Sequence, residues 1–325
     1  MVSIIIPLKK DQGYLQPCVE ACFGQYGVEM EVIVLPDEPE EVVDSRVIQE
    51  ATGPVSPARK RNRGAELAKG EILAFIDDDT RPVEGWLEAA LPHFNDPKVA
   101  AVGGPSITPR IDPFWAQVSG AVYESWMMSG NAVHRYRPGV ACCVDDYPSC
   151  NLLVRRTAFK MVNGFGTDFW PGEDTEFCLA LVKAGFRICY EPTAVIEHHR
   201  RPSLRKHFIQ LANYGLHRGY FAKRYPETSR RLPYFLPSTL VVGGTGLLAL
   251  VLLGPTPFQW VFEFLAILYF MLAAASLAEK PFRLILPAVC VIFASHVVYG
   301  VAFLRGLAAA RLPEEKASVA GSPCR

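Results

Sequence analysis

The feature that most constrains this chain is a series of three apolar segments near its C-terminal end. Residues 238–254 and 284–304 contain no Lys, Arg, Asp or Glu, and residues 258–278 contain only Glu263. Each segment is 17 to 21 residues long, and about 20 helical residues cross the hydrocarbon of a bilayer. Buried helices of a soluble domain are the alternative. Three such runs in succession favour membrane-spanning helices, about three of them within residues 237–305, followed by a disordered tail over 306–325.

A basic segment precedes the apolar runs. The whole chain has 33 Lys and Arg against 33 Asp and Glu, but residues 200–231 hold nine basic side chains and a single acid, Glu227. Positive charge beside apolar helices is typical of the cytoplasmic face of a membrane protein. Apolar residues recur at helical spacing there, so residues 200–236 are predicted to form interfacial amphipathic helices, with ordinary packed helices as the alternative. The zero overall charge argues against a nucleic-acid partner.

The loops between the apolar runs leave the number of crossings open. The first connection, residues 255–257, is uncharged and fits the outside, whereas the second carries Lys280 and Arg283 and fits the cytoplasm. A third crossing would place the basic residues after position 304 outside, against the positive-inside rule. Either one run is re-entrant or interfacial, or the rule is weakly broken.

The N-terminal part is expected in the cytosol. Residues 2–8 are apolar but too short for a signal peptide, and no basic start precedes them. The nine cysteines include no Cys-x-x-Cys pair, which favours reduced thiols. We therefore expect a multi-pass protein of the cell (inner) membrane whose main domain faces the cytoplasm.

Residues 1–199 alternate between β-rich and helical stretches. The predicted strands are residues 2–6, 31–35, 71–76, 99–103, 152–155, 187–191 and 194–197, and the predicted helices are 14–25, 56–69, 83–94, 113–127 and 174–184. This alternation predicts an α/β fold with a mostly parallel sheet and helices on both faces. Ligands of such sheets bind at the carboxyl ends of the strands. Asp37 and the cluster Asp77 to Asp79 follow two predicted strands directly.

Three consecutive carboxylates, Asp77, Asp78 and Asp79, follow the third predicted strand. Packed together they repel one another, and each raises the pKa of its neighbours. A hard divalent cation with oxygen ligands would compensate them, and a phosphate-bearing substrate would account for Mg²⁺ or Mn²⁺. A charged turn at a strand end is the alternative.

Two further candidates occur later in the domain. Glu173 and Asp174 begin a predicted helix, where the helix dipole favours acids by about 0.3–1 kcal/mol. They are either capping residues or a general base at the edge of the sheet. His198 follows another predicted strand and is either structural or a metal ligand.

The ordered set of these motifs resembles glycosyltransferase family 2. The matching strings are Arg61-Asn62-Arg63-Gly64, Gly70-Glu71-Ile72, Asp77-Asp78-Asp79, Asn163-Gly164-Phe165, Gly172-Glu173-Asp174, Gly185-Phe186-Arg187, and Pro192 with His198. They occur in the order typical of the family and spread over residues 2–198. The resemblance implies a GT-A fold (Rossmann-like) over residues 1–199, a UDP- or GDP-linked sugar donor, and a divalent metal, Mn²⁺ or Mg²⁺.

The resemblance also implies roles for individual residues. Asp79 and His198 would ligate the metal, and Asp77 or Asp78 would contact the ribose or base of the donor. Asp174 would be the base that deprotonates the acceptor hydroxyl, with inversion at the anomeric carbon. The remaining residues expected at the nucleotide are Pro7, Asp37 and Arg61, and those expected on the acceptor or membrane side are Trp170, Glu173, Arg200 and Arg201.

Departures from the family pattern limit the resemblance. The family often shows Asp-Asp-x-Ser after the second strand, whereas this chain has Leu35-Pro36-Asp37-Glu38, so Asp37 alone would carry that contact. Processive polysaccharide synthases carry Gln-x-x-Arg-Trp after the base, and the nearest string here is Gln210-Leu211-Ala212-Asn213-Tyr214. This difference speaks against processive synthesis.

The sequence therefore predicts a membrane-anchored, inverting, non-processive glycosyltransferase of polysaccharide or glycolipid biosynthesis. It would transfer one sugar to a lipid-linked or membrane-proximal acceptor. A polyprenyl-phosphate sugar synthase, a nucleotidyltransferase, and a catalytically inactive membrane scaffold with a nucleotide-sugar-binding fold are the alternatives.

Overall fold

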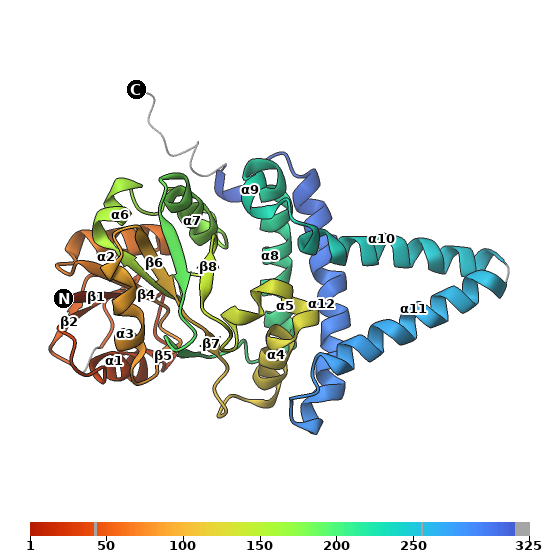
Figure 1. The fold of residues 1–325 in the computed structure, drawn as a ribbon, viewed down its shortest axis with the longest axis horizontal. Helices are drawn as coiled ribbons and strands as arrows, with labels where there is room; N and C mark the ends of the chain where they lie inside the picture. Colours follow the sequence, from red (N-terminus) through yellow and green to blue (C-terminus); the bar gives the residue numbers. More distant parts are fainter. Residues whose placement is uncertain (42–43, 255, 316–325) are drawn as a thin grey trace. The chain divides into compact units, whose positions relative to one another are not determined.

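The computed structural model describes residues 1–41, 44–254 and 256–315, and the chain divides into two compact units (Figure 1). Unit 1 comprises Met1–Ile107, Arg137–His199 and a short stretch from Pro313 onward; unit 2 comprises Thr108–Tyr136 and Arg200–Leu312. The division after His199 lies where the sequence places a domain boundary. Thr108–Tyr136 groups with the later residues instead, because Val118 and Val122 pack in one apolar cluster with helix residues beyond position 270.

The core of unit 1 is an eight-stranded sheet. Its strands are β1 (Val2–Pro7), β2 (Met30–Leu35), β3 (Val47–Gln49), β4 (Ile72–Ile76), β6 (Val99–Gly103), β8 (Cys142–Val144), β9 (Asn151–Arg155) and β10 (Arg187–Tyr190). They are ordered β3-β2-β1-β4-β9-β6-β10-β8, and the β9 and β8 pairings are antiparallel. The predicted mostly parallel α/β sheet is thus confirmed. Its central strands are continuous apolar runs because both faces are covered.

Helices cover both faces of this sheet. They are α1 (Leu15–Phe23), α2 (Pro57–Leu67), α3 (Trp86–Ala90), the 3₁₀ helix η1 (Leu91–Asn95), α6 (Arg156–Met161) and α7 (Glu173–Lys183). Side chains alternate along β1, so Ile4 and Ile6 pack with α1 and α3 whereas Ile5 packs with α2 and α7. The predicted helix 83–94 is divided between α3 and η1.

A small second sheet adjoins the first within unit 1. It contains β5 (Thr80–Pro82), β11 (Ile196–His198) and β7 (Ser106–Ile107), in the order β5-β11-β7. In the antiparallel pairing of β11 with β5, His198 lies opposite Thr80. This pairing fixes the backbone of His198 beside that of the aspartate cluster.

The secondary structure of unit 2, over its described residues, consists of helices. Its elements are α4 (Phe114–Glu124), α5 (Trp126–Ser129), η2 (Gly130–Arg135), α8 (Leu204–Arg224), α9 (Pro226–Ser229), α10 (Leu232–Leu253), α11 (Thr256–Ala275) and α12 (Phe282–Ala308). The three predicted apolar segments lie in α10, α11 and α12. The described part of the chain thus contains three helices that are long and apolar enough to cross a membrane.

Glycines let α8 and α12 pack with their backbones in close contact. A Cβ atom at Gly219 would lie 2.0 Å from the carbonyl oxygen of Phe303, and one at Gly306 would lie 1.9 Å from that of Leu216. Small residues at such positions are typical of tightly packed apolar helices. The two helices could not approach this closely with any larger side chain at these positions.

We expect Gly219→Ala to lower the stability of unit 2 by about 1–3 kcal/mol, because the added methyl group overlaps a backbone carbonyl that cannot move aside without separating the helices. Thermal unfolding of the purified protein in detergent measures the effect. Gly243→Ala is the matched control, since a Cβ atom at Gly243 meets nothing within 4 Å. Equal melting temperatures for the two variants would contradict the packing argument.

Candidate active site

The expected nucleotide residues meet at one edge of the large sheet. Pro7 ends β1 and lies opposite Leu35, the last residue of the parallel strand β2. Asp37 follows β2, and Asp77 follows β4, the other neighbour of β1. Because these three strands are parallel neighbours, their carboxyl ends lie side by side, where α/β sheets bind ligands.

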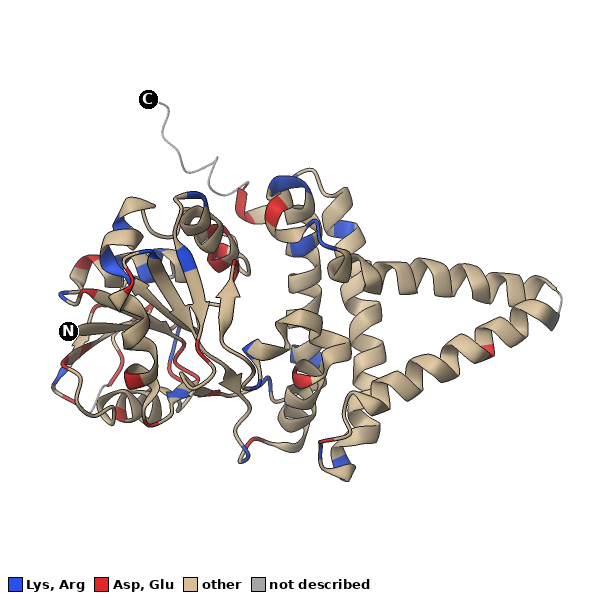
Figure 2. Cartoon of the chain, viewed as in Figure 1, with Lys and Arg blue, Asp and Glu red and all other residues tan. Residues whose placement is uncertain are grey.

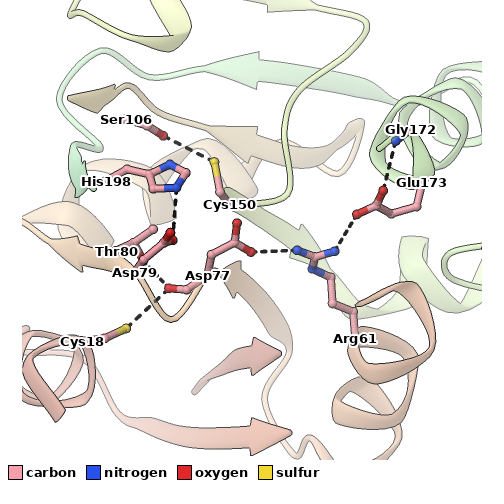
Figure 3. A network of polar contacts seen from close by, with 10 residues as sticks. All are labelled: Cys18, Arg61, Asp77, Asp79, Thr80, Ser106, Cys150, Gly172, Glu173 and His198. Atoms are coloured by element: carbon pink, nitrogen blue, oxygen red, sulfur yellow. Dashed lines mark hydrogen bonds and ion pairs between the residues drawn. The ribbon is translucent and has the colours of Figure 1, made fainter. Parts of the chain in front are cut away.

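Asp77, Asp79 and His198 form a compact cluster of potential metal ligands. One ligand atom from each residue lies within 4.8 Å of the others. His198 Nε2 lies 3.1 Å from Asp79 Oδ1 (Figure 3). The backbone supports this arrangement, since the N–H of His199 donates to the carbonyl oxygen of Asp79 at 3.0 Å. The short strands β5 and β11 therefore bring together residues that are more than a hundred positions apart in sequence.

The electrostatics of the cluster favour an added cation. Burial raises the pKa of Asp78 to about 7, together with the charges of Asp79 and Asp77. Burial alone lowers the pKa of His198, but the charge and hydrogen bond of Asp79 outweigh it and raise that pKa to about 10. The charges of Asp77 and Asp79 add to the effect of burial on Asp78, and that of Asp79 dominates at His198, so negative charge is concentrated at this edge of the sheet.

The donor set fits a divalent metal. Two carboxylates and one imidazole nitrogen are ligands that Mn²⁺ accepts, and the carboxylates also suit Mg²⁺. Three protein ligands leave coordination positions for oxygens of a substrate. Asp77, Asp79 and His198 are therefore the residues that would hold such an ion.

A buried arginine connects the cluster to helix α7. Arg61 Nη2 lies 2.8 Å from Asp77 Oδ1, and Arg61 Nη1 lies 2.8 Å from Glu173 Oε1 (Figure 3). The side chains of Arg61 and Glu173 are only 4% and 5% exposed. Arg61 lies on α2, whose N-terminus has Ser56 as a cap and Pro57 in its first turn. The ion pairs thus join α2, β4 and α7 at one point.

Glu173 and Asp174 are adjacent but lie in different environments. Glu173 also accepts a hydrogen bond from the N–H of Gly172 at 3.1 Å. Burial and the charge of Asp174 raise its pKa to about 7, against the opposing effect of Arg61. Asp174 is half-buried, and its Oδ1 accepts from the N–H of Thr175 at 2.8 Å. Glu173 is thus committed to the ion pair with Arg61, whereas Asp174 is less buried.

Asp37 has a partner that the sequence did not indicate. Lys60 Nζ lies 2.6 Å from Asp37 Oδ1 and donates to the carbonyl oxygens of Leu8 at 2.9 Å and Leu35 at 3.2 Å. Lys60 therefore links the ends of β1 and β2 and balances the charge of Asp37. Its position next to Arg61 in a basic helical stretch is the only sequence signal that could have identified it.

Cys150 is a second residue that the sequence analysis missed. Its sulfur lies 3.6 Å from Ser106 Oγ (Figure 3) and beside the imidazole of His198, whose pKa it contributes to raising. Ser106 belongs to β7, the third strand of the small sheet. No motif in the sequence marks Cys150, because its contacts with Ser106 and His198 depend on the pairing of β7 with β11 in the small sheet.

The residues expected on the acceptor or membrane side fall in both units. Trp170 is in unit 1 with its side chain exposed, and Glu173 is the buried partner of Arg61 described above. Arg200 and Arg201 begin the second part of unit 2. Arg200 is buried; its backbone N–H donates to Asp112 Oδ2 at 3.1 Å, and its guanidinium lies over the ring of Tyr136. Arg201 is half-buried.

We expect Arg61→Ala to lower the free energy of unfolding of unit 1 by about 3–5 kcal/mol, because it leaves two carboxylates without their shared cation, one of them fully buried. Arg59→Ala is the control on the same helix. It removes an ion pair with Asp168 whose arginine is 63% exposed, so we expect a loss of about 1 kcal/mol at most. Thermal or denaturant unfolding measures both variants, and a loss for Arg61→Ala as small as that for Arg59→Ala would contradict the structural role.

Comparison with known proteins agrees with this fold. A sequence model of the family described as Glycosyl transferase family group 2 matches residues 72–278. The chain is 31% identical over 262 residues to the pre-mycofactocin glycosyltransferase of Mycobacterium tuberculosis; the match covers 78% of the chain but only 52%, about half, of that relative. It is 25% identical to a dolichyl N-acetyl-alpha-D-glucosaminyl phosphate 3-beta-D-2,3-diacetamido-2,3-dideoxy-beta-D-glucuronosyltransferase of Methanococcus voltae, over 94% of the chain and 97% of that relative.

A solved structure shares the fold over most of the chain. The mannosyltransferase PcManGT from Pyrobaculum calidifontis, in complex with GDP-Man and Mn²⁺, superposes with a TM-score of 0.62 at 17% sequence identity, covering 92% of this chain and 86% of that one. This similarity supports the GT-A fold of unit 1. Since the family match includes the aspartate cluster, Glu173, Asp174 and His198 and extends over more than half of the sequence, the chain belongs to glycosyl transferase family group 2.

Proposed function

We propose that this protein is a membrane-anchored, inverting, non-processive glycosyltransferase. It transfers one sugar from a UDP- or GDP-linked donor to a lipid-linked acceptor at the cytoplasmic face of the cell membrane. The observation that carries the proposal is the arrangement at the sheet edge. The Arg61 ion pairs join the cluster of potential metal ligands there to Glu173, the neighbour of Asp174 in the first turn of α7.

The names of relatives support a lipid-linked acceptor. The Methanococcus voltae relative is named for a dolichyl phosphate-linked sugar. So is the glucosyl-dolichyl phosphate glucuronosyltransferase of Haloferax volcanii, which is 24% identical over 74% of this chain. The mycobacterial relative is named for a different acceptor, pre-mycofactocin. Three apolar helices in the same chain favour an acceptor that stays at a membrane.

The cluster would bind the diphosphate end of the donor. Asp77, Asp79 and His198 would hold Mn²⁺ or Mg²⁺, which when bound supplies positive charge to the departing nucleoside diphosphate. Asp78, Pro7 and Asp37 lie at the same carboxyl edge of the sheet and would contact the nucleoside. The ion pair with Lys60 fixes the position of the Asp37 carboxylate.

Asp174 would act as the general base. Its carboxylate would accept the proton of the acceptor hydroxyl while that oxygen attacks the anomeric carbon from the face opposite the diphosphate. The new C–O bond forms as the bond to the diphosphate oxygen breaks, so the anomeric configuration inverts. Arg61 would position the base, because it joins the N-terminal residue of α7 to Asp77.

The helix that follows unit 1 gives no support for processive synthesis. Gln210 and Tyr214 lie on α8, and Gln210 Nε2 donates to Tyr214 Oη at 3.1 Å, so these two side chains bond to each other. The Arg-Trp pair of the processive motif is not present at this position in the sequence. We therefore propose the addition of a single sugar.

Purified full-length protein tests the proposal directly. Thermal-shift measurements with UDP- and GDP-sugars and Mn²⁺ in detergent identify the donor, and that donor is then incubated with membrane lipid extracts. The expected result is metal-dependent release of UDP or GDP with one sugar added per acceptor and an inverted anomeric signal by NMR. Donor binding without turnover on any acceptor would support the inactive scaffold. Diphosphate release from a nucleoside triphosphate would support a nucleotidyltransferase.

A further inference from the structure

The three apolar helices of unit 2 are not equivalent in their packing. Only 6% of the most apolar stretch of α10 is buried, and the same holds for α11, whereas half of that of α12 is buried. Figure 1 shows α10 and α11 leaving α12 and converging at their other ends. The first two helices thus have almost no fully buried residues in these stretches, whereas α12 is covered by protein along one side.

The side-chain contacts that join α12 to the hairpin lie near the start of α10 and near the end of α11. Near the start of α10, the rings of Phe235 and Phe303 lie 4.8 Å apart, and Ser238 Oγ donates to the carbonyl oxygen of Gly300 at 3.0 Å. Near the end of α11, Tyr269 Oη lies 2.6 Å from His296 Nδ1. Three helices that cross a bilayer side by side would instead be in contact over much of their length.

Helix α12 runs along α8 instead. His207 Nε2 lies 3.1 Å from Ser295 Oγ, and the close backbone contact at Gly219 and Phe303 lies three turns further along α8. The same α8 carries five Lys and Arg side chains: Arg205, Lys206, Arg218, Lys223 and Arg224. If α12 crossed the membrane, α8 would have to enter the hydrocarbon with it, where charged side chains are strongly disfavoured.

The side of α12 that faces the α10–α11 hairpin carries an apolar stripe. Phe282, Leu286, Phe293 and Leu304 are exposed and share one face of the helix. Phe293 also lies against the rings of Tyr269 and Phe270 of α11. On the other side Leu284, Ala288 and Ile292 pack with α4. Phe114 and Trp115 of α4 are also exposed, and Trp residues concentrate at membrane interfaces.

Basic residues flank the α10–α11 hairpin at its two chain ends. Helices α10 and α11 contain no Lys or Arg and only one acid, Glu263 (Figure 2). Arg230 and Arg231 immediately precede α10, and Lys280 and Arg283 follow α11. The positive-inside rule places both hairpin ends on the cytoplasmic face.

We propose that the chain crosses the bilayer twice, through the α10–α11 hairpin. Helix α12 lies with α8 and α4 at the boundary between headgroups and acyl chains, with its apolar stripe toward the lipid. This inference concerns the number of crossings and does not depend on which sugar the protein transfers. It also places the basic residues at the end of α12 on the same face as α8, in accordance with the positive-inside rule.

Variants with one introduced cysteine in intact membranes test the topology. Cys142, Cys143, Cys290 and Cys324 are first replaced by serine. In this background Phe282→Cys and Ala308→Cys mark the ends of α12, Leu253→Cys marks the hairpin tip, and Val140→Cys marks the side of unit 1. Spheroplasts and inside-out vesicles are treated with a membrane-impermeant maleimide, and labelling in detergent confirms that each cysteine reacts. We expect the cysteines at 282, 308 and 140 to be labelled from one side and that at 253 from the other.

Labelling of the cysteines at 282 and 308 from opposite sides would overturn the proposal, because it requires α12 to cross. Labelling at 253 from the same side as 140 would overturn it too, because the hairpin would not cross. A depth measurement is independent of both. A fluorophore on Phe293→Cys should be quenched more by shallow than by deep nitroxide lipids, whereas one on Val242→Cys, midway along α10, should show the reverse. A deep position for both would contradict an interfacial α12. Cysteine labelling and fluorescence quenching do not require glycosyltransferase activity. The proposed topology and the proposed function can therefore be refuted independently of each other.

Discussion

Replacing Asp174 by asparagine should lower kcat by about 10²–10⁴-fold, the contribution typical of a general base. The amide cannot accept the proton of the acceptor hydroxyl, but it occupies the same volume and can still accept from the N–H of Thr175. We therefore expect the melting temperature and the donor KM to stay near those of the wild type. Initial rates at saturating donor and acceptor measure the effect.

Glu176→Gln is the matched control for this variant. Glu176 lies in the same first turn of α7 and has the same favourable interaction with the helix dipole. If Asp174 served only to cap the helix, the two variants would lose similar amounts of stability and little activity. Wild-type turnover by Asp174→Asn would therefore contradict the base assignment. If that turnover depended on a polyprenyl phosphate, the result would favour a polyprenyl-phosphate sugar synthase, because an acceptor that is already anionic needs no strong base.

Removing the metal, or one of the residues that would bind it, should also lower turnover strongly. We expect EDTA treatment to abolish turnover and Mn²⁺ to restore it. Asp79→Asn should lower kcat/KM by about a thousandfold, since several kcal/mol of charge stabilisation are lost and each 1.4 kcal/mol is tenfold in rate. The Mn²⁺ concentration for half-maximal activity should also rise, because Asp79 and His198 would bind the same ion.

Asp44→Asn is the control for this prediction. Asp44 is an aspartate paired with Arg46 on the surface of unit 1, and it lies outside the cluster. Binding of Mn²⁺ measured by electron paramagnetic resonance gives a readout besides activity. Unchanged Mn²⁺ affinity and turnover in Asp79→Asn would exclude this cluster as the metal site.

Local patterns account for the parts of the fold that were predicted. The strands β1, β2, β4 and β6 are short apolar runs bounded by turn residues, so their burial on both faces is visible in sequence. The short strands β5, β7 and β8 were not predicted. They are two or three residues long, and they exist because a distant segment pairs with them. Thr108–Tyr136 grouped with unit 2 for the same reason, since its apolar face has its partners beyond position 270.

The residues of the candidate site also divide into those that a local pattern predicts and those that depend on contacts between distant segments. Asp77 to Asp79 were identified because they are contiguous and follow a strong strand, and His198 because it follows another. The ion pair between Arg61 and Glu173 joins residues 112 positions apart, and no local pattern indicates it. Lys60 was missed because its ion pair with Asp37 depends on how α2 packs against the ends of β1 and β2.

The sequence by itself determined which residues are apolar enough to be buried in a sheet or in a bilayer and where acidic side chains follow a strand, because periodicity, charge and spacing are local properties of the chain. Only the tertiary structure decided which of two adjacent acids is neutralised by Arg61, which strand brings His198 to Asp79, and which of three similar apolar helices is covered by protein. Each of these depends on contacts between segments distant in sequence, and such contacts are set by the packing of the whole unit.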